Sequence, residues 1–222
     1  MSLPMADLVP HHLAYRTVRR HVAELALRAP EVADTMVPAC PEWTVRDLVA
    51  HLAANCAGML GEPAAADGTG FADVVAGWQR AAGRMERLAA DGAMDIIRML
   101  MDAFTHELDL RAALGVAAPV DHVAYPPALE VVVGGLSWSV SSRGLPALRL
   151  VCEDTCWAVG AGRPVATVTA PRYHLYRSLT GRRTHAQIAG LDWSADPGQW
   201  LPAFSWGPFT APARPVERGS VR

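Results

Sequence analysis

Apolar residues in the first half of the chain recur every three or four positions, which is the spacing of one face of an α-helix. This period predicts helices at residues 6–29, 44–60, 71–90 and 93–114. The clearest apolar stripe consists of Val45, Leu48, Leu52, Cys56 and Met59. The second helix also has a defined start, because Thr44 at its N-cap and Asp47 three residues later form a capping box. Four consecutive helices of this kind predict a four-helix bundle.

The pattern changes after a segment rich in proline and alanine at residues 117–127. Residues 128–142 have a helical period, but the short apolar runs after them are bounded by turn residues, as strands are. The predicted strands lie at residues 148–151, 156–159 and 165–169. Short helices are predicted at about 171–179 and after Gly181.

The two patterns together predict an α+β protein. A helical bundle is expected in residues 6–116 and a small α/β domain in residues 128–210. The tail from Pro208 is rich in proline and arginine, and we expect it to be poorly ordered.

Three residues on two of the predicted helices form a candidate metal site. Asp102 and His106 are four residues apart, so their side chains leave the helix in the same direction. His51 lies on the flank of the second helix beside Asn55, where a ligand can face inward and remain near an opening. Three such ligands leave a coordination position open for chemistry. The alternative is a hydrogen-bonded histidine and an ordinary Asp/His pair, since the apolar pattern does not fix where Asp102 and His106 point.

Two segments resemble motifs of one known family. Residues 41–54, PEWTVRDLVAHLAA, resemble the helix-opening motif of the mycothiol-dependent maleylpyruvate isomerase family. Residues 102–115, DAFTHELDLRAALG, resemble a second motif, in which a carboxylate is followed four residues later by histidine. The resemblance implies a DinB-like metal-binding four-helix bundle followed by a small α/β domain. It also implies that His51, Asp102 and His106 are the metal ligands.

One position departs from the family pattern, which usually has Glu where this chain has Asp102. Asp is one methylene shorter, so the metal is bound more weakly, is of another kind, or is absent. Asp109, one turn beyond His106, is a candidate substitute ligand or a hydrogen-bonding partner of a ligand. His11 and His12 are candidate extra ligands, but neighbouring helical residues diverge by about 100°, so at most one can face the site.

The resemblance also implies a reaction. A divalent metal, with zinc as the first choice and nickel or another metal as alternatives, would deprotonate the thiol of mycothiol. In the resembling isomerases the thiolate adds to a conjugated cis double bond, the bond rotates, and elimination returns the trans product; other members are thiol S-transferases. Arg172, Arg177, Arg182 and Arg183 are candidate ligands for a substrate carboxylate, with Arg177 and Arg182 as the preferred pair; the alternative for each is a solvated surface side chain. The competing hypothesis is a non-catalytic bundle that sequesters a ligand or binds a partner and has weakened or lost the metal.

The amino-acid composition narrows the possible classes of protein. The 222 residues have a formal net charge of -2, without the basic stripe of nucleic-acid-binding proteins. No apolar run reaches the roughly 20 residues of a membrane span, and the first residues lack a signal-peptide pattern, so we expect a cytoplasmic protein with small-molecule partners. All 20 basic residues are arginine, which favours a GC-rich, actinobacterial source. The 4 cysteines lack C-x-x-C spacing and are interpreted as structural.

Overall fold

The computed structural model describes residues 9–63 and 70–217 of the chain. These residues fall into a helical unit that ends at residue 128 and an α/β unit that begins at residue 129. The described residues contain seven α-helices and one four-stranded sheet, which confirms the predicted α+β class. None of the helices in these ranges combines the length and the apolar character that a membrane span requires.

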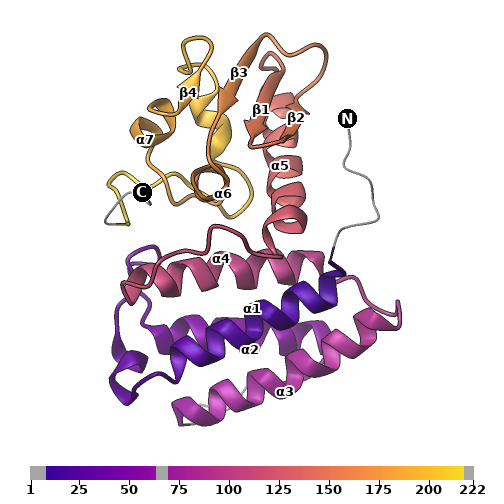
Figure 1. Cartoon of the computed structure of the whole chain (residues 1–222), viewed down its shortest axis with the longest axis vertical. Coiled ribbons are helices and arrows are strands. Elements are labelled where there is room, and N and C mark those ends of the chain that lie inside the picture. Colours follow the sequence, from indigo (N-terminus) through magenta and orange to yellow (C-terminus); the bar gives the residue numbers. More distant parts are fainter. Residues whose placement is uncertain (1–8, 64–69, 218–222) are drawn as a thin grey trace. The chain divides into compact units, whose positions relative to one another are not determined.

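Four helices form most of the helical unit (Figure 1). They are α1 (His11–Ala26), α2 (Val45–Leu60), α3 (Phe71–Ala90) and α4 (Ile97–Ala113). Helix α1 packs against α3 and α4, and α2 packs against the same two helices. The four predicted helices are confirmed, although residues 6–8 of the first lie outside the described residues. Helix α4 starts later than predicted because the Asp95 side chain accepts the Ile97 N–H at 3.0 Å and holds a turn there.

Helix α2 begins where the sequence indicates. Thr44 Oγ1 accepts the Asp47 N–H at 3.3 Å, and Asp47 Oδ2 accepts the Thr44 N–H at 2.8 Å, so the predicted capping box is present. The helix ends at Gly61, whose φ of 68° is in the left-handed region that glycine adopts without strain. Both ends of the helix that carries His51 are therefore fixed locally.

Helix α4 is buried around its whole circumference over two turns. Every residue from Ala103 to Leu110 is buried, including the polar residues His106, Glu107 and Asp109. An apolar stripe therefore cannot indicate which face of α4 points inward. The polar side chains buried on this helix must find partners within the protein, because an unpaired buried charge is strongly destabilising.

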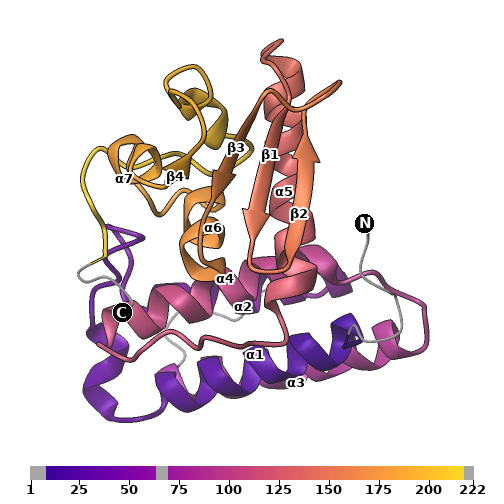
Figure 2. The same cartoon turned by 45° about the horizontal axis from the view of Figure 1, so that its top comes forward.

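The α/β unit contains most of α5 (Tyr125–Ser142) and a sheet with strand order β2-β1-β3-β4. The strands are β1 (Leu148–Cys152), β2 (Thr155–Val159), β3 (Ala166–Thr169) and β4 (Asp192–Trp193). Strand β1 pairs antiparallel with β2 and parallel with β3, and β3 pairs antiparallel with β4. Helix α5 lies along the sheet (Figure 2), and its Ser137 accepts the Gly160 N–H at the end of β2. The three predicted strands are confirmed, whereas the two-residue β4 was not predicted.

The remaining helices of this unit are α6 (Arg172–Leu179) and α7 (His185–Ala189). The chain then runs back along the unit, and the expectation of a poorly ordered tail from Pro208 is wrong for the described residues up to 217. Trp206 and Phe209 form a β-bridge, and the Ala211 N–H donates to Ser205 Oγ at 3.1 Å. The tail is held by tertiary contacts, which its proline-rich composition does not reveal.

Candidate metal centre

Helices α2 and α4 bring the three predicted ligands together. His51 Nε2 lies 3.4 Å from Asp102 Oδ2, and His106 Nε2 lies 3.6 Å from Asp102 Oδ1. The two imidazole rings are 5.0 Å apart between centroids. We call these three residues the His51 cluster. Two donor atoms bound tetrahedrally to one zinc ion at about 2.0–2.1 Å are separated by about 3.3–3.4 Å, so the nitrogen–oxygen distances fit a shared ion after small side-chain movements.

Burial leaves this cluster open on one side. The side chains of His51 and Asp102 are 31% and 28% exposed, whereas that of His106 is 7% exposed. The indole of Trp43, from the same motif as His51, lies 5.0 Å from the His51 ring and 5.7 Å from the His106 ring. The cluster therefore has an aromatic wall on one side and retains access for a small ligand.

Asp102 carries the negative charge that a cation requires. Burial opposes ionisation of its carboxyl, but hydrogen bonding to His51, the charges of His106 and His51, and the Asn55 amide together lower its pKa below the ordinary value. The group is a carboxylate at neutral pH. Two imidazoles and one carboxylate are a donor set suited to zinc and related divalent metals, so the residues present fit such an ion.

Asp109 orients His106. Its Oδ2 lies 3.0 Å from His106 Nδ1, and a carboxylate can only accept there, so the imidazole proton is on Nδ1. His106 Nε2 is then left with a lone pair directed toward Asp102. Asp109 is fully buried behind the histidine, which favours its role as a hydrogen-bonding partner over that of a substitute ligand. Cys40, whose Sγ lies 3.9 Å from Asp109 Oδ2, extends this arrangement by one weak hydrogen bond.

Asn55 competes with a cation for the same atoms. Its Nδ2 lies 3.0 Å from His51 Nε2 and 3.0 Å from Asp102 Oδ2. An amide nitrogen can only donate, so Asn55 supplies hydrogen atoms to one lone pair on each side chain. The sequence placed Asn55 beside His51 without revealing this role, although its position one turn after His51 is the available signal.

The other candidate residues are located elsewhere. Arg177 is fully buried in the α/β unit, where it forms an ion pair with Glu217. Arg182 instead donates to the Thr180 carbonyl oxygen at 2.6 Å. His11 and His12 belong to none of the metal-ligand groups found among the described residues.

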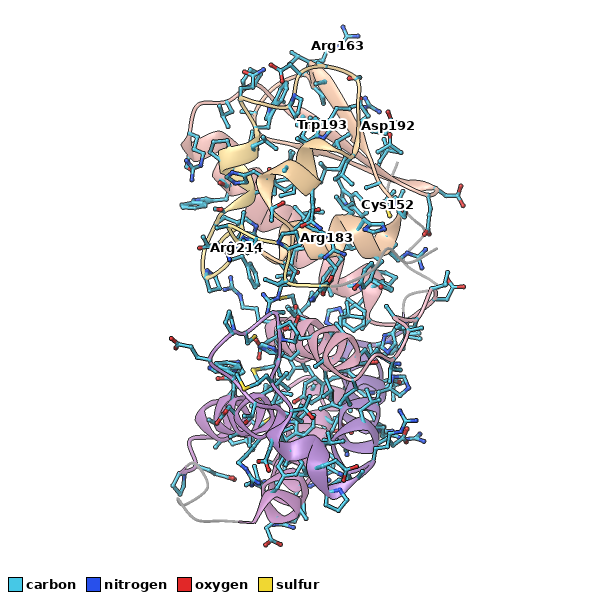
Figure 3. All side chains as sticks on the ribbon, turned by 90° about the vertical axis from the view of Figure 1, so that its left-hand side faces the viewer. Cys152, Arg163, Arg183, Asp192, Trp193 and Arg214 are labelled. Carbon is cyan, nitrogen blue, oxygen red and sulfur yellow. The ribbon has the colours of Figure 1, made fainter. Side chains whose placement is uncertain are left out.

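Arg183, another of the arginines considered from the sequence, is the second partner of Glu217. It is 6% exposed, lies among the side chains of the α/β unit (Figure 3), and forms an ion pair with Glu217. Arg177, Arg183 and Glu217 are called the Glu217 cluster below. Burial opposes ionisation of Glu217, but the charges of the two arginines and their hydrogen bonds lower its pKa.

The fold and the site together define a class of protein, a four-helix bundle that carries two histidines and a carboxylate on facing helices. One known family matches this chain. The sequence profile described as "Mycothiol maleylpyruvate isomerase N-terminal domain" matches residues 11–136, more than half of the chain. The protein therefore belongs to the mycothiol-dependent maleylpyruvate isomerase family.

Solved structures agree in fold. The crystal structure of a mycothiol-dependent maleylpyruvate isomerase superimposes with a TM-score of 0.53 at 15% identity, covering 87% of this chain and 94% of the solved chain. A histidine-to-alanine mutant of that enzyme gives a TM-score of 0.57 with the same identity and coverage. Comparison with curated protein sequences gives no significant match.

Proposed function

We propose that this protein is a metal-dependent enzyme that uses mycothiol to isomerise a small carboxylate-bearing substrate, or to attach the thiol to that substrate through its sulfur atom. The observation that carries the proposal is the convergence of His51, Asp102 and His106, in a member of this family, at distances compatible with one shared ion. The cluster is open enough to admit a thiol and still has one deeply buried ligand.

The proposed division of roles follows from the contacts. His51 Nε2, Asp102 and His106 Nε2 would hold a divalent cation, zinc or a related metal, which when bound lowers the pKa of a coordinated thiol and so supplies a thiolate near neutral pH. Asp109 keeps His106 in the tautomer that leaves Nε2 free. Trp43 covers one side of the cluster and limits water there.

In the isomerase reaction the thiolate sulfur would form a bond to one carbon of a conjugated cis double bond, and the electron pair of that double bond would move into the conjugated carbonyl group until elimination of the thiolate returns it. Rotation about the resulting single bond and loss of the same thiol then return a trans double bond, so no oxidant or reductant is consumed. A transferase reaction would stop after the first bond has formed.

Within the α/β unit, arginine side chains are the proposed carboxylate-binding groups. Arg177 and Arg183 already bind the carboxylate of Glu217, so a substrate carboxylate would have to take the place of Glu217 between them. Arg182, whose Nη1 is directed to a backbone carbonyl, would have to change partner to serve in the same way. Arg177, Arg182 and Arg183 are therefore the proposed carboxylate-binding residues of this unit.

A specific contact favours a second candidate function. Because the Asn55 amide donates to both His51 and Asp102, the cluster is satisfied in part without a cation. This suits a non-catalytic family member that sequesters a ligand or binds a partner.

An experiment that removes the metal and then restores it distinguishes the two candidate functions. Full-length protein without an affinity tag is treated with a chelator and then assayed for mycothiol-dependent conversion of maleylpyruvate, before and after one divalent metal is restored. The proposal predicts that conversion disappears on removal and returns with the metal. Metal binding without conversion of maleylpyruvate or transfer of the thiol would support the non-catalytic function instead.

A further inference from the structure

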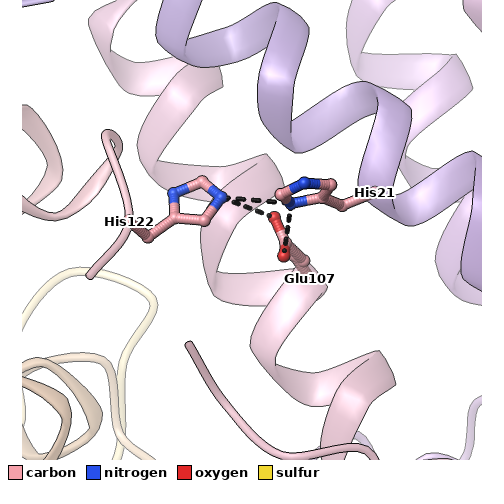
Figure 4. A group of neighbouring side chains, drawn as sticks. All are labelled: His21, Glu107 and His122. Atoms are coloured by element: carbon pink, nitrogen blue, oxygen red, sulfur yellow. Dashed lines mark hydrogen bonds and ion pairs between the residues drawn. The ribbon is translucent and has the colours of Figure 1, made fainter. Parts of the chain in front are cut away.

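A second group of metal-ligand side chains lies on a different face of α4. Glu107 follows His106 directly, so the two side chains leave the helix about 100° apart. Around Glu107 the structure places His21 from α1 and His122 from the segment before α5 (Figure 4). We call these residues the His21 cluster. All three belong to the helical unit and come from three separate parts of its chain.

The donor atoms are as close together as ligands of one ion. His21 Nδ1 is 3.1 Å from Glu107 Oε1, His122 Nε2 is 3.4 Å from Glu107 Oε2, and the two ring nitrogens are 3.2 Å apart. Ligands of a tetrahedral zinc ion are about 3.3–3.4 Å apart when the bonds are about 2.0–2.1 Å long. The three distances therefore outline one triangular face of such a coordination shell.

Glu107 provides an independent sign that a cation belongs here. Its side chain is fully buried, and Oε1 accepts from Arg111 Nε at 2.8 Å. Oε2, which faces His122, is buried without a hydrogen-bond partner. A carboxylate oxygen is thus buried beside two imidazole nitrogens, at 3.4 Å from His122 Nε2.

We propose that His21, Glu107 and His122 form a second divalent metal site, distinct from the His51 cluster. Two imidazoles and one carboxylate select zinc or another late first-row metal over magnesium or calcium, which prefer oxygen ligands. The bound ion joins α1, α4 and the chain that leads into α5. Its role is to stabilise the helical unit, because two of the three ligands are at most 8% exposed.

The contacts of His122 determine what must change when a metal ion binds at its Nε2 atom. Its ring stacks on Phe104 at 4.7 Å, and its Nδ1 accepts the Ala124 N–H at 3.0 Å, so Nε2 is held toward the cluster. That hydrogen bond places the imidazole proton on Nε2 in the metal-free protein. Binding at Nε2 moves the proton to Nδ1, so the hydrogen bond to Ala124 and the hydrogen bonds of His21 Nδ1 to His122 and Glu107 are exchanged for three coordination bonds. His21, with its side chain 33% exposed, gives the ion a route from solvent.

The number of zinc ions bound per chain, measured in matched variants, tests this site. Full-length untagged protein is stripped with a chelator and titrated with zinc against a competing indicator, together with His21→Gln, His122→Asn and the double variant His51→Ala/His106→Ala. His11→Gln is the control, because it makes the same change as His21→Gln at an exposed position of the same helix. Circular dichroism checks that each variant is folded.

The expected result is that His21→Gln and His122→Asn each bind one zinc ion fewer than wild type, while His11→Gln binds the same number. The His51→Ala/His106→Ala protein keeps one ion, and zinc raises its melting temperature. Equal stoichiometry in wild type and folded His21→Gln overturns the inference, as does a folded double variant that binds no zinc. Wild type that binds a single ion, lost in His21→Gln but kept in the double variant, upholds this site and contradicts the metal of the proposed function instead.

Discussion

Each of the two units contains a carboxylate that is partly or almost fully buried, but the side chains around the two carboxylates differ in kind. In the helical unit, Asp102 faces two imidazoles and keeps 28% of its side chain exposed. In the α/β unit, Glu217 is 4% exposed and lies between the guanidinium groups of Arg177 and Arg183. Guanidinium groups are permanently charged and cannot coordinate a cation, so the charge of Glu217 is already balanced. Imidazoles have lone pairs, so Asp102 remains available for a metal. The residue types around a carboxylate therefore distinguish a candidate metal ligand from a carboxylate already held in an ion pair.

The largest expected effect comes from neutralising Glu217. Glu217→Gln retains the shape of the side chain but leaves two buried guanidinium groups without their anion, so the free energy of unfolding should fall by about 3 kcal/mol or more. Glu153→Gln is the control, because Glu153 pairs with Arg172 in the same unit but is 44% exposed; its loss should be below about 1 kcal/mol. Urea unfolding measures both. Equal effects would show that burial does not distinguish the two ion pairs.

The same variant gives a pH dependence with a defined sign. The pKa of Glu217 is lowered in the folded protein, so its contribution to stability is present above the ordinary glutamate value of 4.5 and is lost as the pH falls through the lowered pKa. The difference in stability between wild type and Glu217→Gln should therefore be constant near neutral pH and shrink in acid. A difference that grows on acidification would contradict this assignment.

The next largest effect concerns the histidine that Asp109 orients. Asp109→Asn removes the carboxylate that accepts from His106 Nδ1, so the affinity of the His51 cluster for zinc should fall about 10- to 100-fold. Asp91→Asn, at an exposed position after α3, serves as the control and should not change the affinity. Competition against a zinc indicator gives both values. An unchanged zinc affinity in folded Asp109→Asn would show that Asp109 does not support metal binding at the His51 cluster.

A smaller gain is expected when the family pattern is restored at residue 102. Asp102→Glu lengthens the carboxylate by one methylene and should keep or strengthen zinc binding, by up to about tenfold, or about 1.4 kcal/mol. The measurement compares the zinc affinities of the two forms side by side. If Asp102→Glu binds zinc more weakly than wild type, the distance between α2 and α4 suits the shorter Asp side chain.

The smallest effect tests the local start of α2. Thr44→Ala removes the hydroxyl that accepts the Asp47 N–H and should destabilise the protein by about 1 kcal/mol. Thr17→Ala, at a half-buried position inside α1 where the hydroxyl donates to the Leu13 carbonyl oxygen of the preceding turn, should change stability by less than half of that. Thermal unfolding of both variants is the measurement, and equal losses would argue against the capping box as the source.

The sequence predicted the features that depend on neighbouring residues. The capping box of Thr44 and Asp47 and the one-turn spacing of Asp102 and His106 are local, and the structure has both. The approach of His51 to α4 is not local; the resemblance to the isomerase family indicated it, because the buried circumference of α4 hides the direction of its polar side chains.

Contacts between distant parts of the chain could not be predicted. Glu217 reaches Arg177 from 40 residues away, and no periodicity marks a tail residue as the partner of a buried arginine. His21 and His122 are 101 residues apart, and His122 precedes a helix without belonging to one. Strand β4 has only two residues and exists through its pairing with β3. In each case, the deciding contact forms only when the chain is folded.

The most direct test of the central claim is the combined zinc content and mycothiol-dependent activity of wild type and His51→Ala. His51 is 31% exposed, so its removal should leave the bundle folded. We expect zinc-loaded His51→Ala to contain one ion fewer per chain than wild type and to lose any thiol-dependent conversion of maleylpyruvate that wild type shows, while His11→Gln changes neither. Unchanged zinc content in folded His51→Ala, or full activity in that variant, would contradict the assignment of the His51 cluster as the catalytic metal centre.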